Sequence, residues 1–544
     1  MVEAQDKPHP VWFRNDIPSR EDCVLPWMLE RNAADTPDRL CFRFADEETW
    51  TCAETLSHTK KTAALLREQG VAPGDFVLVW MPSSAAIIRA WFAINYLGAV
   101  FVPINTDYRG KILHHAITES SARILIAHQQ LVPRLNDIEP TPLERVLSLA
   151  EPETTPGEPL QVVVTDLVGG EKEVPEPAPV NAWDLQMIIF TSGTTGPSKG
   201  VMCPYLHQYT VGQGSYGYMD ESDCIMVELP MFHVGGVSPV MGALANRASI
   251  ALFPGFSTQE FWQRIKATGA TTTSGLIGSM ANFLAKAPPA PDEKNNTLRM
   301  VTLMLTPEVI EVADRYGFDY ISGFNMTELS VPLVTEVNCR VPGSMGKPRI
   351  GCECRVVDEH DYECDPNVVG ELVVRTDQPW RVNMGYLNRP EATAAAWRNG
   401  WFHTGDLVRC DEDGNFFFVD RLKDAMRRRG ENVSSVEVEL EVLSFPGIAE
   451  AAAVGVESEH GEQDILVAVV VKPQMEVSNR ELIEFLVPRM PHYMVPRYIR
   501  TMTALPKTAT NKITKVSIRE EGVTPDTWDR EAENIILKKT KFSD

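Results

Sequence analysis

The stretch "TSGTTGPSKG" at residues 191–200 gathers hydroxyl side chains, three glycines and one lysine directly after the apolar run "MIIF". A glycine-rich turn that follows a strand exposes successive backbone N–H groups, and these bind phosphate oxygens. The hydroxyls add donors and Lys199 adds a positive charge, so these residue types predict a polyphosphate site; a flexible linker is the alternative. The P-loop of kinases and GTPases is excluded, because it requires Ser or Thr after the lysine, where this chain has Gly200.

The elements around this loop alternate between strand-like and helical patterns. "DFVLVWM", "AVFVPI", "ARILIA" and "LQMIIF" are apolar strand patterns, and "SSAAIIRAWFAINYLG" is a helical one. Such alternation predicts α/β layers with largely parallel sheets. After residue 342 the short runs "CECRVVDE", "GELVVRT" and "GNFFFVD" predict a smaller β-rich unit. After residue 420, a helix over 434–445, two strands and the helix "NRELIEFLVPRM" predict a compact α+β unit.

Composition narrows the class of protein. A chain of 544 residues is too long for one core, so two or more domains are expected. The net charge of −23 argues against binding of nucleic acid or anionic membranes. No signal peptide is recognised at the N-terminus, and the apolar region 76–104 is interrupted by charge and proline, which predicts no membrane span. Ten scattered cysteines predict buried free thiols and a cytoplasmic protein.

Five segments in the same order resemble the adenylate-forming superfamily, which comprises acyl-CoA synthetases, peptide-synthetase adenylation domains and beetle luciferases. They are "TSGTTGPSKG", "FNMTE" at 324–328, "GWFHTGD" at 400–406, "DRLKDAMRRRGENVSSVEVE" at 420–439 and "LPKTATNK" at 505–512. The fourth is most similar to bacterial carnitine/crotonobetaine-CoA-ligase-like enzymes. The resemblance implies an α/β fold: a large N-terminal domain (1–420) of two layered α/β subdomains plus a small β-rich subdomain, a hinge (421–423), and a mobile α+β C-terminal domain (424–544).

The resemblance also implies the residues that hold ATP, namely Thr191, Ser192, Gly193, Thr194, Thr195, Lys199, Phe324, Asn325, Asp406 and Arg421. Glu328 would bind Mg²⁺ and the Thr327 hydroxyl a phosphate oxygen, a pairing that suits a metal–triphosphate complex. Asp406 follows an aromatic-rich turn and would accept both ribose hydroxyls, while Phe324 would stack on adenine. Read without the resemblance, Glu328 would be a solvated charge, Asp406 a capping aspartate and Phe324 a core aromatic ring.

Three further roles follow from the resemblance to the family's C-terminal segments. Lys512 would join Thr327 and Glu328 as a catalytic residue, by bridging the attacking carboxylate and the α-phosphate. Lys423 would be the hinge about which the C-terminal domain rotates. Arg427 and Gly430 would contact coenzyme A. The alternatives are a surface lysine, an exposed lysine at a strand end and a basic turn.

The acyl pocket implied by the family is lined by His233, Gly235, Gly236, Ser274, Gly275, Gly323 and Val331. Its small residues could leave room for a bulky acyl group or could be tight packing points. Two departures from the family concern the nucleotide site: Asn325 replaces a frequent glycine, and "RMVTLMLTPEVI" lacks the glycine-rich turn that wraps adenine. His233 stands where amino-acid-activating domains often have aspartate, which disfavours an α-amino acid substrate.

The predicted function is that of an AMP-forming acyl-CoA synthetase, which consumes a small carboxylic acid, ATP and coenzyme A with Mg²⁺ as cofactor. Transfer to a carrier protein instead of coenzyme A is the first alternative. A luciferase-like oxidoreductase and a non-catalytic nucleotide-binding protein are the other two. The acid and the oligomeric state, including a homodimer, are left open.

Overall fold

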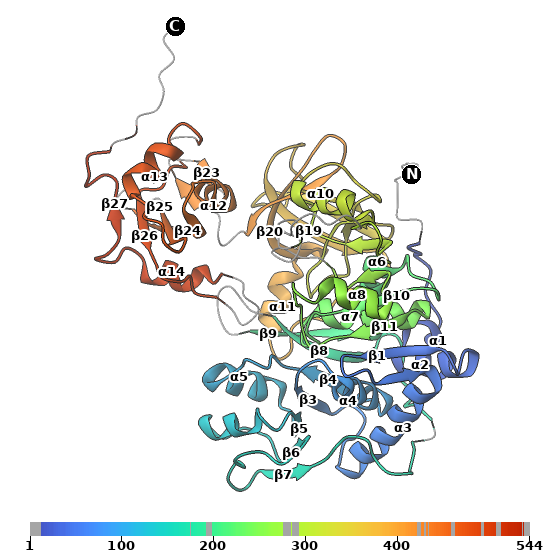
Figure 1. Ribbon diagram of the computed structural model, residues 1–544. Coiled ribbons are helices and arrows are strands. Elements are labelled where there is room, and N and C mark those ends of the chain that lie inside the picture. Colours follow the sequence, from blue (N-terminus) through green and yellow to red (C-terminus); the bar gives the residue numbers. More distant parts are fainter. Residues whose placement is uncertain are drawn as a thin grey trace.

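The computed structural model describes residues 12–174, 176–191, 198–275, 284, 293–421, 426–428, 431–433, 435–458, 463–490, 494–507, 513–535 and 537. Their strands form four main sheets with helices packed between and around them (Figure 1), and the mixed α/β class predicted from the sequence is confirmed. Among the helices of these ranges, none has the length and apolar character needed to cross a bilayer.

The first sheet carries the strand that leads into the glycine-rich loop. Its seven strands are parallel except for the last pair, which forms a hairpin. In spatial order they are β7 (Gln161–Val164), β6 (Arg145–Ser148), β5 (Ile124–Ala127), β3 (Phe76–Trp80), β4 (Val100–Pro103), β8 (Leu185–Thr191) and β9 (Lys199–Pro204). The connecting segments include α4 (Ala85–Tyr96), α5 (Gly110–Ser120) and the 3₁₀ turn η1 (Val132–Asp137).

The second sheet has five strands, all parallel except for the edge pair β1–β2. In order they are β12 (Thr272–Thr273), β10 (Cys224–Val227), β11 (Ser249–Leu252), β1 (Leu40–Phe44) and β2 (Thr49–Thr51). The helices that adjoin these strands in the chain are α1 (Arg20–Cys23), α2 (Leu25–Asp35), α3 (Cys52–Glu68), α6 (Tyr205–Tyr216), α7 (Val234–Asn246) and α8 (Phe261–Thr268). A parallel pair, β13 (Met300–Thr302) and β14 (Asp319–Ile321), flanks α10 (Pro307–Tyr316).

The third sheet is antiparallel throughout. In order its strands are β15 (Gly323–Phe324), β16 (Leu333–Val334), β17 (Ser344–Pro348), β21 (Phe416–Arg421), β20 (Phe402–Cys410), β19 (Gly370–Thr376) and β18 (Cys352–Val357), with α11 (Pro390–Ala396) and the 3₁₀ turn η2 (Arg398–Gly400) between β19 and β20. All ten cysteines are free, as predicted, but only five are buried. The partly exposed ones include Cys354, Cys364 and Cys410, which pack at the margin of this sheet's core.

The C-terminal elements lie to the left of these sheets in Figure 1. A hairpin of β22 (Met426–Arg428) and β23 (Glu431–Val433) precedes a four-stranded sheet of β24 (Ile448–Glu457), β25 (Gln463–Val471), β26 (Tyr498–Thr501) and β27 (Trp528–Asp529). The accompanying helices are α12 (Ser435–Leu443), α13 (Asn479–Leu486) and α14 (Lys515–Glu521). The helix predicted over 434–445 is therefore present, although its proposed cap Ser434 lies outside the described residues.

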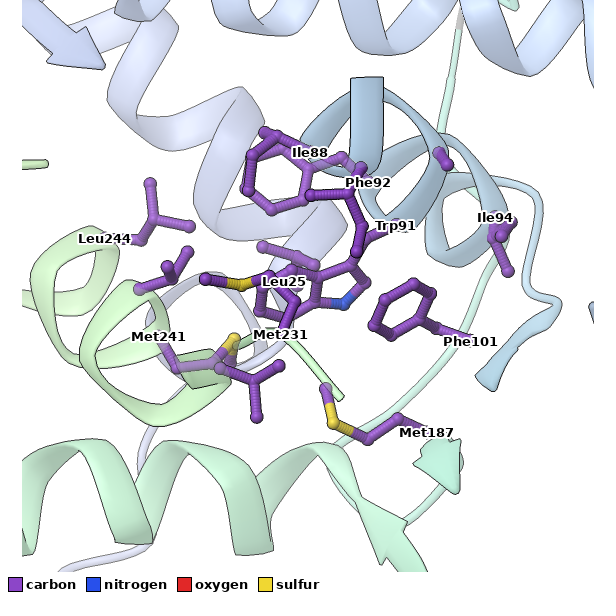
Figure 2. Close-up of a cluster of buried hydrophobic side chains, with 14 of the residues drawn as sticks. Leu25, Ile88, Trp91, Phe92, Ile94, Phe101, Met187, Met231, Met241 and Leu244 are labelled. Atoms are coloured by element: carbon purple, nitrogen blue, oxygen red, sulfur yellow. The ribbon is translucent and has the colours of Figure 1, made fainter. Parts of the chain in front are cut away.

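A core of large side chains joins the first two sheets (Figure 2). Trp91 of α4 is fully buried and stacks on Phe101 of β4 with 5.4 Å between ring centroids. The Trp91 indole N–H donates to Asn95 Oδ1 (3.0 Å), and Asn95 Nδ2 donates to the carbonyl of Gln186 in β8 (2.9 Å). Satisfying every polar group of a buried asparagine in this way fixes α4 against the strand that leads to the glycine-rich loop.

Candidate active site

The hairpin of β8 and β9 brackets the glycine-rich loop. Thr191 pairs with Lys199 across the hairpin, and the Thr191 hydroxyl donates to the Lys199 carbonyl (3.3 Å). A Cβ on Gly200 would lie 2.8 Å from Ile188 Cγ2, so packing against the neighbouring strand requires glycine there. Thr191 and Lys199, the first and last residues of this loop that were predicted to bind ATP, thus lie opposite each other at the edge of the sheet. Four others, Ser192, Gly193, Thr194 and Thr195, lie outside the described residues.

Residues 383–387, which we call the strap, extend the pairing of β9. The Leu387 N–H donates to the Gly200 carbonyl (2.8 Å), and Met384 and Gly385 exchange backbone hydrogen bonds with Met202. At its start the strap holds a second segment, since the backbone N–H and the Nδ2 of Asn383 both donate to the Glu328 carbonyl, at 3.1 and 2.7 Å. The strap therefore joins the glycine-rich hairpin to the Thr–Glu segment.

The Thr–Glu segment is a buried turn. The Leu329 N–H donates to the Met326 carbonyl (3.0 Å) and closes a turn that contains Thr327 and Glu328, whose exposed fractions are only 8% and 7%. Behind it, Nε2 of the fully buried His207 donates to the Leu329 carbonyl (3.0 Å). Glu328 is thus held in place within the protein, which argues against the alternative of a solvated surface charge.

Tyr386 of the strap contacts the two charged groups of this region. Its hydroxyl donates to Glu328 Oε1 (2.9 Å), and the Lys199 ammonium lies over its ring, 4.4 Å from the centroid. Burial, and then the neighbouring Glu328 carboxylate, raise the pKa of Tyr386, so the phenol stays protonated and donates. Tyr386 was not among the residues predicted from the sequence. The glycine and asparagines of "NMGYLNRP" indicate a turn, but nothing local indicates its contacts.

The residues proposed for the base and ribose occupy two strands of the third sheet. Phe324 ends β15 and is partly buried, as expected of a ring at a strand end, and Asn325 Oδ1 accepts from the Val331 N–H (3.4 Å). Asp406 follows the 3₁₀ turn η2, which lies between Trp397 and Trp401. It is fully buried inside β20 and pairs with Arg421 of β21, which argues against the alternative of a capping aspartate within a turn. On the β19 side the register of the ladder shifts between His403 and Leu407, and Gly405 in this stretch has a φ of 71°.

Five candidates for the acyl pocket lie at the carboxyl end of β12 and at the start of α7, whereas Gly323 begins β15 and Val331 precedes β16. The Ser274 hydroxyl accepts from the Glu228 N–H (3.3 Å), and the Gly275 N–H donates to the Thr273 hydroxyl (3.4 Å). His233 caps α7 by accepting from the Gly235 N–H at Nδ1 (3.0 Å).

Small residues in this region are tight packing points. A Cβ on Gly236 would lie 2.2 Å from the Pro230 carbonyl oxygen, and one on Gly323 would lie 2.7 Å from the Leu333 oxygen. Val331 has the unusual φ of 49° for a β-branched residue. It faces Gly214, where a Cβ would lie 3.1 Å from its own. These glycines are therefore required by packing, whether or not an acyl group lies beside them.

The segments predicted to carry the catalytic lysine and the hinge are described only at their margins. Lys512, Lys423 and Gly430 lie outside the described residues, and Arg427 is placed only as a backbone position in β22, opposite Asn432.

A polar cluster joins β21 to the C-terminal elements. Ser435, at the start of α12, donates to Asp420 Oδ2 from its backbone N–H (2.6 Å) and from its hydroxyl (2.7 Å). Lys515 bonds to the Ser435 hydroxyl and pairs with Glu439 (2.8 Å). Both Asp420 and Ser435 are buried, so the two sides of the proposed hinge contact each other directly.

Comparison with known proteins identifies the family. The sequence matches the model of AMP-binding enzymes over residues 29–387 and that of the AMP-binding enzyme C-terminal domain over residues 437–512. A feruloyl-CoA synthase from an Amycolatopsis species is 30% identical over 86% of this chain and 93% of the relative. The crotonobetaine/carnitine–CoA ligase of Salmonella arizonae is 27% identical over 84% and 91%, respectively.

The fold is shared with solved structures of the same kind. The O-succinylbenzoate coenzyme A synthetase of Bacillus subtilis in complex with AMP has a TM-score of 0.77 and 25% identity, and the match covers 91% of this chain and 98% of that one. The predicted superfamily is confirmed: the chain belongs to the adenylate-forming family of AMP-binding enzymes and is an acid–thiol ligase.

Proposed function

We propose that this enzyme is an AMP-forming acyl-CoA synthetase that activates a small carboxylic acid in two steps. The observation that carries the proposal is the junction of the β8–β9 hairpin with Glu328 through the strap. It brings a lysine ammonium, a buried carboxylate and the ends of a glycine-rich loop to one place, as a metal–triphosphate complex requires. The relatives that this chain matches are CoA ligases.

The first step joins two anions. A carboxylate oxygen of the acid attacks the α-phosphorus of ATP, and the bond from that phosphorus to the bridging oxygen breaks, so that pyrophosphate leaves with the electron pair. Repulsion between the reactants has to be screened by fixed positive groups and donors. We assign this role to Lys512 at the α-phosphate, and to Lys199, Thr191 and the backbone of the glycine-rich loop at the other phosphates.

Glu328 and Thr327 suit the magnesium ion that such a complex carries. Within the described residues, no group of three or more His, Cys, Asp or Glu side chains forms a dedicated metal cage. Magnesium bound with a nucleotide needs only one or two carboxylates, because phosphates and waters supply the rest of its ligands. Glu328 would hold the ion and Thr327 a phosphate oxygen. When bound, Mg²⁺ neutralises phosphate charge.

The nucleoside would lie against the third sheet. We assign Phe324 to stacking on adenine, Asp406 to the ribose hydroxyls, and Arg421 to the ribose and α-phosphate. The pairing of Asp406 with Arg421 across β20 and β21 supports a shared site for these two residues. We assign Asn325, which follows Phe324 in the chain, to the same part of the nucleotide site.

The second step transfers the acyl group. The thiol of coenzyme A loses its proton to solvent and its sulfur attacks the acyl carbon, and the bond from that carbon to the phosphate oxygen breaks to release AMP. We propose that residues 424–544 rotate about Lys423 between the steps, which withdraws Lys512 and presents Arg427 and Gly430 to coenzyme A. The location in the cytoplasm proposed here agrees with ten free cysteines.

The acid binds among the residues His233, Gly235, Gly236, Ser274, Gly275, Gly323 and Val331. We propose an acid that lacks an α-ammonium group, because His233 occupies the place of a counter-charge. Matching relatives are named for feruloyl, long-chain fatty acyl and succinylbenzoate substrates, so family membership alone selects no single acid.

Pyrophosphate release with a panel of carboxylic acids, with and without coenzyme A, tests the proposal. We expect release with at least one acid, an acyl-adenylate by mass spectrometry, and a thioester only when coenzyme A is present. Formation of the acyl-adenylate without any thioester would favour the alternative in which the acyl group is transferred to a carrier protein. No adenylate with any acid, in the presence of ATP and Mg²⁺, would refute the assigned reaction.

A further inference from the structure

Tyr386 is held in place more firmly than a side chain that only fills space. Its N–H donates to the Thr393 hydroxyl (2.9 Å), and its backbone forms a bridge with Val201 of β9. The next residue pairs with Gly200, and the preceding Gly385 has a φ of 110° that few other residues adopt. The backbone of Tyr386 is thus fixed relative to the β8–β9 hairpin, and its side chain is buried.

Tyr386 contacts a negative group through its hydroxyl and a positive group through its ring. A carboxylate with 7% exposure requires hydrogen-bond donors, and the phenol supplies one to Glu328 Oε1 at 2.9 Å. The ring face attracts the Lys199 ammonium, 4.4 Å from the centroid. A single rigid side chain therefore determines where an anionic group and a cationic group lie relative to each other.

We propose that Tyr386 is a positioning residue for nucleotide binding, which aims the Glu328 carboxylate at the metal and the Lys199 ammonium at the phosphates. Tyr386 acts through these two side chains and needs no contact with the substrate itself. The inference rests on the proposed function, because it assigns to Glu328 and Lys199 the roles given above.

Two substitutions separate the two contacts. Tyr386→Phe keeps the ring under Lys199 and removes the hydroxyl from Glu328. The loss of one hydrogen bond to a charged group should raise the Mg²⁺ concentration for half-maximal pyrophosphate release about tenfold. Tyr386→Leu removes the ring as well and should also raise the KM for ATP, by roughly three- to tenfold.

The matched control is Tyr96→Phe. Tyr96 is fully buried in α4, and its hydroxyl likewise donates to a glutamate, Glu30 of α2 (2.5 Å), which has no role in the proposed site. It loses the same kind of bond with no expected change in Mg²⁺ requirement. Calorimetric titration of ATP into each protein, with and without MgCl₂ and without any acid, gives a readout that is independent of turnover.

The expected result is weaker ATP binding in the presence of Mg²⁺ for Tyr386→Phe, unchanged binding without Mg²⁺, and normal thioester formation from supplied acyl-adenylate. An unaltered Mg²⁺ requirement together with an unaltered calorimetric affinity in Tyr386→Phe would overturn the inference. So would an equal loss in both half-reactions, which would indicate a general structural defect. Failure of the wild-type enzyme to release pyrophosphate would instead refute the proposed function.

Discussion

His207 provides a measurable link between acid pH and the stability of the Thr–Glu turn. Its Nε2 donates to the Leu329 carbonyl, which can only accept, so the neutral ring carries its proton on Nε2. Nδ1 is buried and has no hydrogen-bond partner among the described residues. Protonation would therefore bury a charged ring with an unsatisfied donor. Burial lowers the pKa of His207 to about 4, and the nearby Arg349 adds to the lowering, while the bond to Leu329 opposes it.

The sign of the effect follows from which state binds the proton. The unfolded chain takes up a proton at the ordinary histidine pKa of 6.5, whereas the folded protein resists uptake until about pH 4. Stability from the neutral ring is fully present above pH 6.5 and is lost as the pH falls toward 4. The whole gap corresponds to about 3 kcal/mol, and the part between about pH 7.5 and about pH 5 to about 2 kcal/mol.

The assay is urea unfolding of the wild type and of His207→Gln, followed by tryptophan fluorescence at both pH values. Glutamine can donate to Leu329 and does not titrate in this range. We expect the wild type to lose about 2 kcal/mol more than the variant on acidification. Equal losses in the two proteins would show that His207 is protonated in the folded state, and the reasoning from its burial would be wrong.

Three further predictions test other parts of the molecule. Lys512→Ala should lower adenylation roughly 10²- to 10³-fold while thioester formation from supplied acyl-adenylate continues; equal losses in both half-reactions would exclude the assigned role. Lys423→Pro should leave pyrophosphate release measurable and suppress thioester formation, because proline restricts φ at the hinge; normal two-step turnover would reject the hinge. Gly236→Ala, whose Cβ would meet the Pro230 oxygen at 2.2 Å, should lower the free energy of unfolding by about 1–3 kcal/mol. Gly255→Ala, with no atom within 4 Å, is the control, and thermal unfolding that fails to distinguish the two would contradict the packing argument.

The local sequence predicted the features that depend on residues close together in the chain. The apolar run before Thr191 and the glycine-rich turn after it were sufficient to predict a strand that ends at the loop, and β8 does so. The alternation of strand and helix patterns was likewise sufficient for the α/β class. These features depend on neighbours in the chain, which a single sequence displays directly.

Contacts between distant segments could not be read in the same way. Tyr386 and Glu328 are 58 residues apart, and they meet because the strap pairs with β9 and its Asn383 donates to the Glu328 carbonyl. Asp406 lies opposite Arg421 because β20 pairs with β21, and no local pattern in the sequence specifies that pairing. The contact between Asp420 and Ser435 likewise depends on how α12 packs beside β21, which no local pattern reports.

The strap has a consequence for how ligand and fold depend on each other. It follows the third sheet's β19 in the chain, adds to the first sheet at β9, and fastens the Thr–Glu turn. A nucleotide seated on Lys199 and Glu328 would therefore bind only molecules in which these sheets have already assembled. By mass action such a ligand raises the melting temperature of the whole assembly and protects the strap from proteases, even though it touches few residues directly.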